Sequence, residues 1–94
     1  MLKLSSESMT SEDQYLSFGR YLRSVRIQTG LSLEEVSWET KIGMENLLLI
    51  EKEDLISLPA EVFVKGFLRS YAKAVGADGD RAVRNYLSSF QVFS

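Results

Sequence analysis

The sequence predicts an all-α domain. Apolar residues recur at three- and four-residue spacings along most of the 94 residues, and no segment alternates every second residue as a half-buried strand does. Glycines and one proline punctuate the chain at intervals typical of short helices. The hydrophobic fraction of 45% is enough for one small core. We expect a flexible N-terminal tail over residues 1–10, which is polar and rich in serine, and one helical domain over residues 11–94.

The first helix should run from Ser11 to about Gln28, with Gly30 as its C-terminal cap. Ser11 and Gln14 can form a capping box. The buried stripe consists of apolar side chains at i, i+4 and i+7, namely Phe18, Leu22 and Val25. The exposed face is basic and carries Arg20, Arg23 and Arg26. Alternatively, Arg20 and Arg23 form internal pairs with glutamates of the following segment.

Residues 31–54 predict two short helices joined by a tight turn. Ser32 and Glu35 form a capping box, so one helix should start at Leu33, with Val36 and Trp38 as its apolar contacts. Residues 40–43 form the connection. The second helix should span about residues 44–52 and bury its apolar positions, Leu47 and Ile50. This layout is that of a helix-turn-helix motif.

The same segment lacks the side chains that read DNA. The second helix of such a motif lies in the major groove, where arginine or lysine contacts guanine and asparagine or glutamine contacts adenine. The candidate DNA-facing residues here are Lys41, Gly43, Met44, Glu45, Asn46 and Leu49, with Leu48 also outward. The segment carries seven carboxylates against two lysines, which phosphate would repel. A motif that serves only as a stable helical corner is the plainer interpretation.

Two further helices should complete the domain. Pro59 suits the first turn of a helix, which should run from Pro59 or Ala60 to Val75 and end at Gly76. Asp78 can cap a last helix to about residue 92, whose apolar contacts are Val83, Leu87 and Phe90. The expected fold is therefore a five-helix, repressor-like helix-turn-helix domain with two additional C-terminal helices.

The fourth helix carries an apolar arc wider than core packing usually needs. Phe63 and Phe67 form one margin of this arc, which we expect to be partly exposed. The small residues Gly66 and Ser70 separate this margin from a basic row at i, i+4 and i+8, namely Lys65, Arg69 and Lys73. Exposed aromatic rings beside cations are typical of protein-binding sites. Alternatively, both rings belong to the core and the basic row is a solvated face.

The composition excludes several kinds of chemistry. The chain has no cysteine and no histidine, so we expect neither a disulfide nor a zinc site, and no cofactor. The carboxylates are not paired with a nucleophile or an apolar setting, so we expect no enzymatic activity. The net charge of -2 gives no support to general nucleic-acid binding.

Two runs of sequence resemble a known family. FGRYLRSVRIQTGLSLEEVSWETKI and LPAEVFVKGFLRSYAKAVGAD are similar to the cytoplasmic helix-turn-helix domain of RodZ-type bacterial cell-shape proteins. The second run is the more distinctive, because ordinary repressor-like domains lack its LP, its aromatic-x-x-Gly-aromatic spacing and its RSYA. The resemblance covers roughly residues 18–86.

The resemblance implies a non-enzymatic adaptor whose cytoplasmic domain binds the actin-like filament protein MreB for cell-shape control. It implies that Phe63 and Phe67 contact the filament, with support from Lys65, Gly66, Arg69 and Ser70. It also implies a parent protein anchored in the inner membrane by a segment absent from this chain. The alternative is a DNA-binding helix-turn-helix transcriptional regulator, which the acidic motif disfavours.

Overall fold

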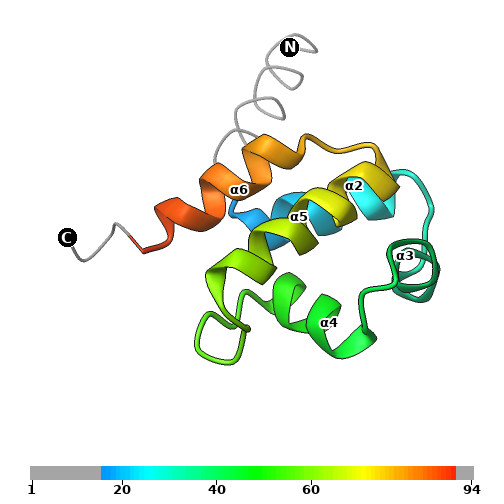
Figure 1. Cartoon of the computed structure of the whole chain (residues 1–94). Coiled ribbons are helices and arrows are strands. Elements are labelled where there is room, and N and C mark those ends of the chain that lie inside the picture. The colour runs from blue at the N-terminus through cyan, green and yellow to red at the C-terminus, as the bar shows by residue number, and fades with distance from the viewer. Residues whose placement is uncertain (1–15, 91–94) are drawn as a thin grey trace, which may run out of the picture.

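Helix α5 lies at the centre of the fold, with α2, α3 and α6 packed against it (Figure 1). The computed structural model describes residues 16–90, and within this range it contains helices and no strands. The helices are α2 (Phe18–Gln28), α3 (Leu33–Thr40), α4 (Met44–Lys52), α5 (Glu61–Val75) and α6 (Gly79–Ser88). Helix α4 packs against α2 and α3. The predicted all-α class and the helix-turn-helix of α3 and α4 are confirmed.

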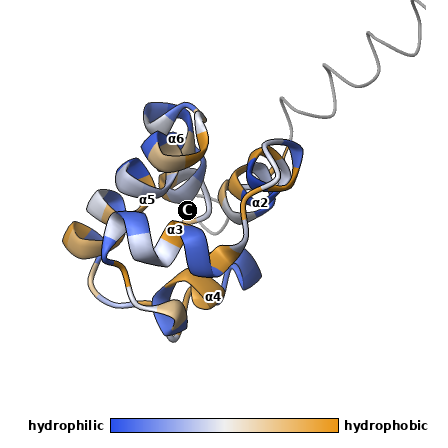
Figure 2. Cartoon of the chain, turned by 90° about the vertical axis from the view of Figure 1, so that its right-hand side faces the viewer, coloured by the Kyte–Doolittle hydropathy of each residue, from blue (hydrophilic) through white to orange (hydrophobic). Residues whose placement is uncertain are grey.

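One hydrophobic core joins the helices. Its buried members are Phe18, Tyr21, Leu22, Val36, Ile42, Leu47, Ile50, Leu58, Val64, Leu68, Tyr71, Ala72, Val75, Ala82, Val83 and Tyr86. Of the periodic positions expected to be buried in the first and third helices, Phe18, Leu22, Leu47 and Ile50 are among them, whereas Val25 is half-buried and packs against the core. Helix α4 is largely hydrophobic in Figure 2, since residues 47–50 form an unbroken apolar run. Within residues 16–90, no helix is both long and apolar enough to cross a bilayer.

Gly19 allows α2 and α4 to approach each other closely. A Cβ atom at this position would overlap the carbonyl oxygen of Ile50 and the side chain of Glu53. Glu53 follows α4 in a left-handed conformation with φ of 58°. Its carboxylate accepts hydrogen bonds from the backbone amides of Gly19 and Arg20, at 2.8 and 3.0 Å. Because these amides belong to the first turn of α2, a side chain distant in sequence satisfies the helix N-terminus.

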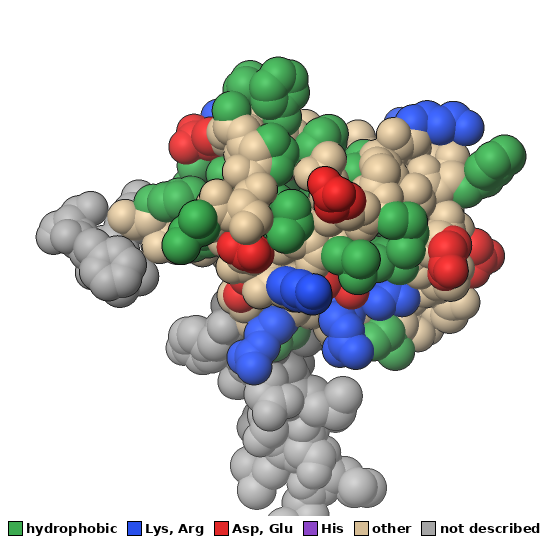
Figure 3. Space-filling model, turned by 90° about the horizontal axis from the view of Figure 1, so that it is seen from below, with side chains coloured by type: hydrophobic (Ala, Val, Ile, Leu, Met, Phe, Trp, Pro, Cys, Tyr) green, Lys and Arg blue, Asp and Glu red, His purple; other side chains and the backbone are tan. Residues whose placement is uncertain are grey.

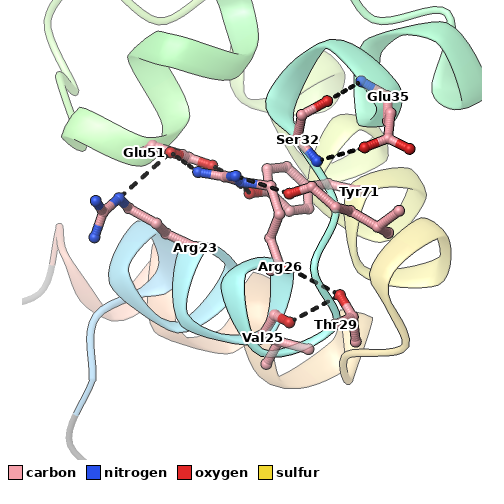
Figure 4. Close-up of polar contacts among 9 residues, drawn as sticks. Arg23, Val25, Arg26, Thr29, Ser32, Glu35, Glu51 and Tyr71 are labelled. Carbon is pink, nitrogen blue, oxygen red and sulfur yellow. Dashed lines mark hydrogen bonds and ion pairs between the residues drawn. The ribbon is translucent and has the colours of Figure 1, made fainter.

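A polar cluster of Arg26, Glu51 and Tyr71 connects α2, α4 and α5 (Figure 4). Arg26 donates from Nε and Nη2 to the two carboxylate oxygens of Glu51, at 2.8 and 3.1 Å. The buried Tyr71 hydroxyl donates to the same carboxylate and accepts from Arg26. The hydrogen bonding that Arg26 donates to Glu51 raises the pKa of Arg26, and burial is the main cause that raises the pKa of Tyr71. A paired and hydrogen-bonded charge of this kind can be held inside a small domain.

Several predicted helix ends are confirmed. The Ser32 hydroxyl accepts from the Glu35 amide at 3.0 Å, and the Glu35 carboxylate accepts from the Ser32 amide at 2.8 Å (Figure 4). The hydrogen bond from the Ser32 backbone amide is the main cause that lowers the pKa of Glu35, and the Ser32 side chain lowers it further. Gly76 ends α5 with φ of 84°, and the Asp78 side chain caps α6 through the Arg81 amide. Gly30, with φ of 77°, follows α2 as expected.

The start of the first helix was predicted wrongly. Leu16 and Ser17 are not helical, and α2 begins at Phe18 with Ser17 as its N-cap residue. The Leu16 carbonyl oxygen instead accepts from the Asn85 side chain on α6, at 3.0 Å. This long-range bond gives the backbone before α2 a partner that local sequence does not reveal. The predicted Ser11 and Gln14 box and the tail over residues 1–10 lie outside the described residues.

The boundaries of the last two helices also differ from the prediction. Pro59 precedes α5, which begins at Glu61 after Ala60 as N-cap residue. The segment before it forms a turn in which the Leu58 amide donates to the Asp54 carbonyl oxygen and Leu58 is buried. Helix α6 ends at Ser88, and Phe90 follows in a turn with about half of its surface exposed. The predicted end near residue 92 lies outside the described residues.

Candidate interaction surface on helix α5

The predicted aromatic margin of α5 is partly exposed. Phe63 is 59% exposed, whereas Phe67 is half-buried and packs against the core. The interior side of the same helix contributes fully buried residues to the core, including Val64, Leu68 and Tyr71. The prediction that both rings lie partly exposed is confirmed, and Phe63 is the more accessible ring. The apolar arc of α5 thus has a buried part and a partly exposed margin.

Gly66 and Ser70 form a low strip beside the aromatic margin. Both residues are exposed, and a Cβ built on Gly66 would have no neighbouring atom within 4 Å. At about 100° per residue, both positions fall between the aromatic margin and the basic row. No other segment within residues 16–90 therefore packs closely against Gly66. An exposed glycine in a helix lowers stability by about 1 kcal/mol relative to alanine. Packing within residues 16–90 therefore does not explain the glycine at this position.

The basic row is partly neutralised by neighbouring carboxylates. Lys65 Nζ lies 3.8 Å from Glu61 on the preceding helical turn, and Arg69 Nε lies 3.6 Å from Asp80 on α6. These pairs are at the surface, where ion pairs contribute little to stability and can exchange for a partner's charges. Further along α5, a hollow of about 300 Å³ lies between this helix and the end of α3. It is lined by Ser70, Lys73 and Ala74 of α5 and by Glu39 and Thr40 of α3. The end of the basic row therefore borders the neighbouring helix.

Sequence reasoning missed two exposed apolar residues near this surface. Val62 is 70% exposed in the first turn of α5, and Ile56 is 96% exposed in the segment before α5. Val62 lies four residues before Gly66, so both fall on one side of the helix. That spacing could have identified Val62, whereas no periodic signal marks Ile56 in a turn. We define the α5 surface as the aromatic margin, the low strip, the basic row and Val62.

The side of the molecule seen in Figure 3 shows how apolar groups are distributed. Helix α4 lies at the bottom of Figure 1 and therefore faces the viewer in Figure 3. Hydrophobic side chains form several groups on this side, and lysine and arginine side chains gather along one edge. Leu48 on α4 is one of the exposed apolar residues, at 43%. This side of the motif thus presents apolar side chains rather than a continuous basic surface.

The candidate DNA-facing residues differ in their exposure to solvent. Gly43 and Glu45 are exposed, and Met44 and Asn46 are half-buried. Leu49, expected to point outward, is half-buried and packs against the core, so it was placed wrongly. Leu49 lies about 100° around the helix from the buried Ile50, so its side chain reaches the core from the flank of α4. Lys41 is exposed, and its ammonium lies 4.6 Å from the ring centroid of Trp38.

The basic face expected on the first helix is largely engaged within the domain. Arg26, predicted to be exposed, is held by Glu51 and Tyr71, so that expectation was wrong. Arg23 Nε lies 3.8 Å from Glu51, which confirms the alternative of an internal pair for this residue (Figure 4). Arg20 is exposed, and its backbone amide contacts Glu53. Helices α2 and α5 pack together.

Other kinds of site have no basis in the described part of the chain. No group of three or more histidine, cysteine, aspartate or glutamate side chains is placed to hold a metal ion within residues 16–90. The one strongly polar cluster, around Glu51, is closed by its own hydrogen bonds and stabilises the fold. The α5 surface is therefore the strongest candidate for function.

Comparison with known proteins identifies the family. Residues 21–82 match the model of a helix-turn-helix domain family. The chain belongs to this helix-turn-helix family and is RodZ-like. The cytoskeleton protein RodZ of Streptococcus pneumoniae is 34% identical over 76 residues, which are 81% of this chain and 28% of that protein. These matches point to a cytoskeleton protein and a helix-turn-helix domain, and no enzyme family is indicated.

Two further relatives extend the comparison. An uncharacterized protein of Haemophilus influenzae is 43% identical over 63 residues, which are 65% of this chain and 20% of that protein. The chain thus spans between a fifth and a third of the length of these two relatives. The solved structure of YmfM from Staphylococcus aureus, described as a proposed DNA-binding membrane protein, superposes with a TM-score of 0.70 at 27% identity. The superposition covers 78% of this chain and 89% of YmfM.

Proposed function

We propose that this domain is a non-enzymatic interaction module that binds the actin-like filament protein MreB through the α5 surface. The observation that carries the proposal is the exposed Phe63 beside the open backbone at Gly66. The similarity to a cytoskeleton protein supports a cytoskeletal partner. The low strip offers room for a partner's backbone, and the basic row offers cations to its carboxylates.

The energetic weight of the anchor follows from its exposed area. Phe63 leaves 59% of its surface in water, which for a residue of about 200 Å² is roughly 120 Å². Covering that area is worth about 3 kcal/mol at roughly 25 cal/mol per Å². A single residue of this weight is comparable to the anchors that dominate protein interfaces. Phe67 adds less, because its ring is already partly buried.

Sedimentation of the full chain with purified MreB filaments tests the proposal. Phe63→Ala should weaken binding by roughly 30-fold, equivalent to about 2 kcal/mol, while the fold is retained because the ring is exposed. Ile27→Ala is the matched control, since it removes an exposed apolar side chain from another helix. Equal binding by wild type and Phe63→Ala would show that filaments do not use this surface.

A second candidate is the DNA-binding regulator, which the helix-turn-helix family and the description of YmfM favour. Against it stand the carboxylate-rich motif and the engaged Lys41. We expect duplex binding to be weak, salt-sensitive and indifferent to sequence. A sequence-specific footprint at physiological salt that disappears on changing Asn46 or Lys41 would favour the regulator instead.

We also propose that the domain acts on the cytoplasmic side of the inner membrane. The RodZ resemblance implies an anchored parent protein, and YmfM is described as a membrane protein. Anchoring would concentrate the α5 surface near its filament without any added contact. Fractionation of cells that express the complete parent protein tests this: it should sediment with membranes, and recovery in the soluble fraction would contradict the proposal.

A further inference from the structure

Trp38 is the most exposed aromatic residue within residues 16–90, at 78%. Val36, two residues earlier on α3, is buried. Since two residues turn a helix by about 200°, burial of Val36 directs Trp38 to the opposite face. We expected both residues to be apolar contacts of this helix, and the exposure of Trp38 shows that this prediction was wrong for Trp38. Tryptophan is strongly enriched among residues that dominate binding energies, so its exposure suggests a contact with a partner.

Trp38 borders a shallow groove at the turn between α3 and α4. The groove has a volume of about 370 Å³ and is lined by Glu34, Ser37, Trp38, Lys41, Ile42, Gly43 and Met44. Lys41, which follows α3 with φ of 66°, places its ammonium 4.6 Å from the Trp38 ring centroid. The ring therefore already attracts a cation by a cation–π interaction. This groove is separate from the aromatic margin of α5, because the two share no residue.

The carboxylates around the groove are the second observation. Glu34 lines it, and Glu45 follows Met44 on α4; both are exposed. None of the ion pairs found within residues 16–90 involves these two carboxylates. Lys41 is the only cation that lines the groove. Residues 31–54 as a whole carry seven carboxylates against two lysines, so the exposed ring lies in a net acidic segment, which is complementary to a cationic partner.

We infer that the Trp38 groove binds an arginine-bearing segment of a protein partner. The guanidinium stacks on the Trp38 ring in place of the Lys41 ammonium and pairs with the Glu34 carboxylate. Arginine fits better than lysine because its planar group stacks on aromatic rings and forms bidentate pairs with carboxylates. In DNA-binding relatives of this motif the corresponding turn approaches phosphates. Here the sign of the charge is reversed, so a basic protein segment replaces the nucleic acid.

Trp38 supplies the signal for the test, because it is the only tryptophan in the chain. Its emission is titrated with the synthetic peptide acetyl-GLRALRGLRG-amide. The control peptide has citrulline, a neutral analogue of nearly the same shape, at each arginine. The arginine peptide should give a saturable change in emission whose midpoint rises with salt. The absence of a saturable change, or an equal response to the citrulline peptide, overturns the inference.

Two substitutions with opposite expected effects sharpen the test. Glu34→Gln removes one carboxylate and should weaken peptide binding by roughly fivefold. Lys41→Asn removes the competing ammonium and keeps a residue that tolerates positive φ, so it should tighten binding. Phe63→Ala should change nothing; weaker binding in that variant would place the peptide on α5 and overturn the inference. A DNA duplex that matches the arginine peptide's response would overturn it as well.

Discussion

Replacing Gly66 and Gly19 by alanine should have opposite effects on stability. Gly66 lies inside α5 with open space around the position of a Cβ atom. Alanine is favoured over glycine there by about 1 kcal/mol, so Gly66→Ala should raise Tm by about 4–8 °C in a domain of this size. At Gly19 the same methyl group would overlap the Ile50 carbonyl oxygen, which is backbone and cannot rotate away. Overpacking of this kind costs about 1–3 kcal/mol, so Gly19→Ala should lower the stability.

Thermal unfolding followed by circular dichroism measures the change in Tm, and urea unfolding measures the change in the free energy of unfolding. Each variant serves as the other's control. Gly66→Ala carries a second readout, since a methyl group in the low strip should obstruct a partner's backbone. Filament binding should fall by roughly tenfold even though the domain is more stable. Loss of stability in Gly66→Ala would refute the open position seen in the structure. Unchanged filament binding would refute the close approach at this glycine while leaving the Phe63 anchor to be judged separately.

The remaining predictions concern stability. Glu51→Ala should lower the free energy of unfolding by about 3 kcal/mol because Arg26 loses its buried partner, whereas the exposed Glu45→Ala should change it by less than about 0.5 kcal/mol. Ser32→Ala should cost about 1 kcal/mol through loss of the cap. In the folded state the pKa of Glu35 lies below its ordinary value of 4.5, because its carboxylate is stabilised there. At pH values above 4.5 the wild type should therefore be more stable than Glu35→Gln. This advantage should shrink as acid protonates Glu35; a pH-independent difference would contradict it.

The sequence predicted the helices well where local chemistry decides them. The capping box at Ser32 and Glu35 marks the start of α3, and Gly76 marks the end of α5 through its left-handed conformation. The prediction of the start of α2 was wrong because this start depends on Glu53 and Asn85, which are far away in sequence. Long-range hydrogen bonds of this kind leave no periodic signal. Element type was therefore predictable, whereas boundaries set by tertiary contacts were not.

The candidate site was predictable only in part for a related reason. The wide apolar arc of α5 correctly indicated exposure at Phe63, because one helix face cannot bury so broad a stripe. The prediction for Trp38 was wrong because only one face of α3 contacts the core, and Val36 occupies that face. Arg26 was misplaced because its partner Glu51 lies on another helix. Helical spacing identifies faces, but only packing decides which charges turn inward.

The second helix of the helix-turn-helix motif has a structural role in this domain. Helix α4 uses Leu47 and Ile50 for the core and Glu51 to hold both Arg26 on α2 and Tyr71 on α5. Its carboxyl end then satisfies the amides of α2 through Glu53. The helix that corresponds to the base-reading helix of a DNA-binding protein therefore also positions its neighbours. Because Tyr71 lies on the same helix as Phe63, this cluster fixes the rotation of α5 that keeps its core side inward and its aromatic margin in solvent.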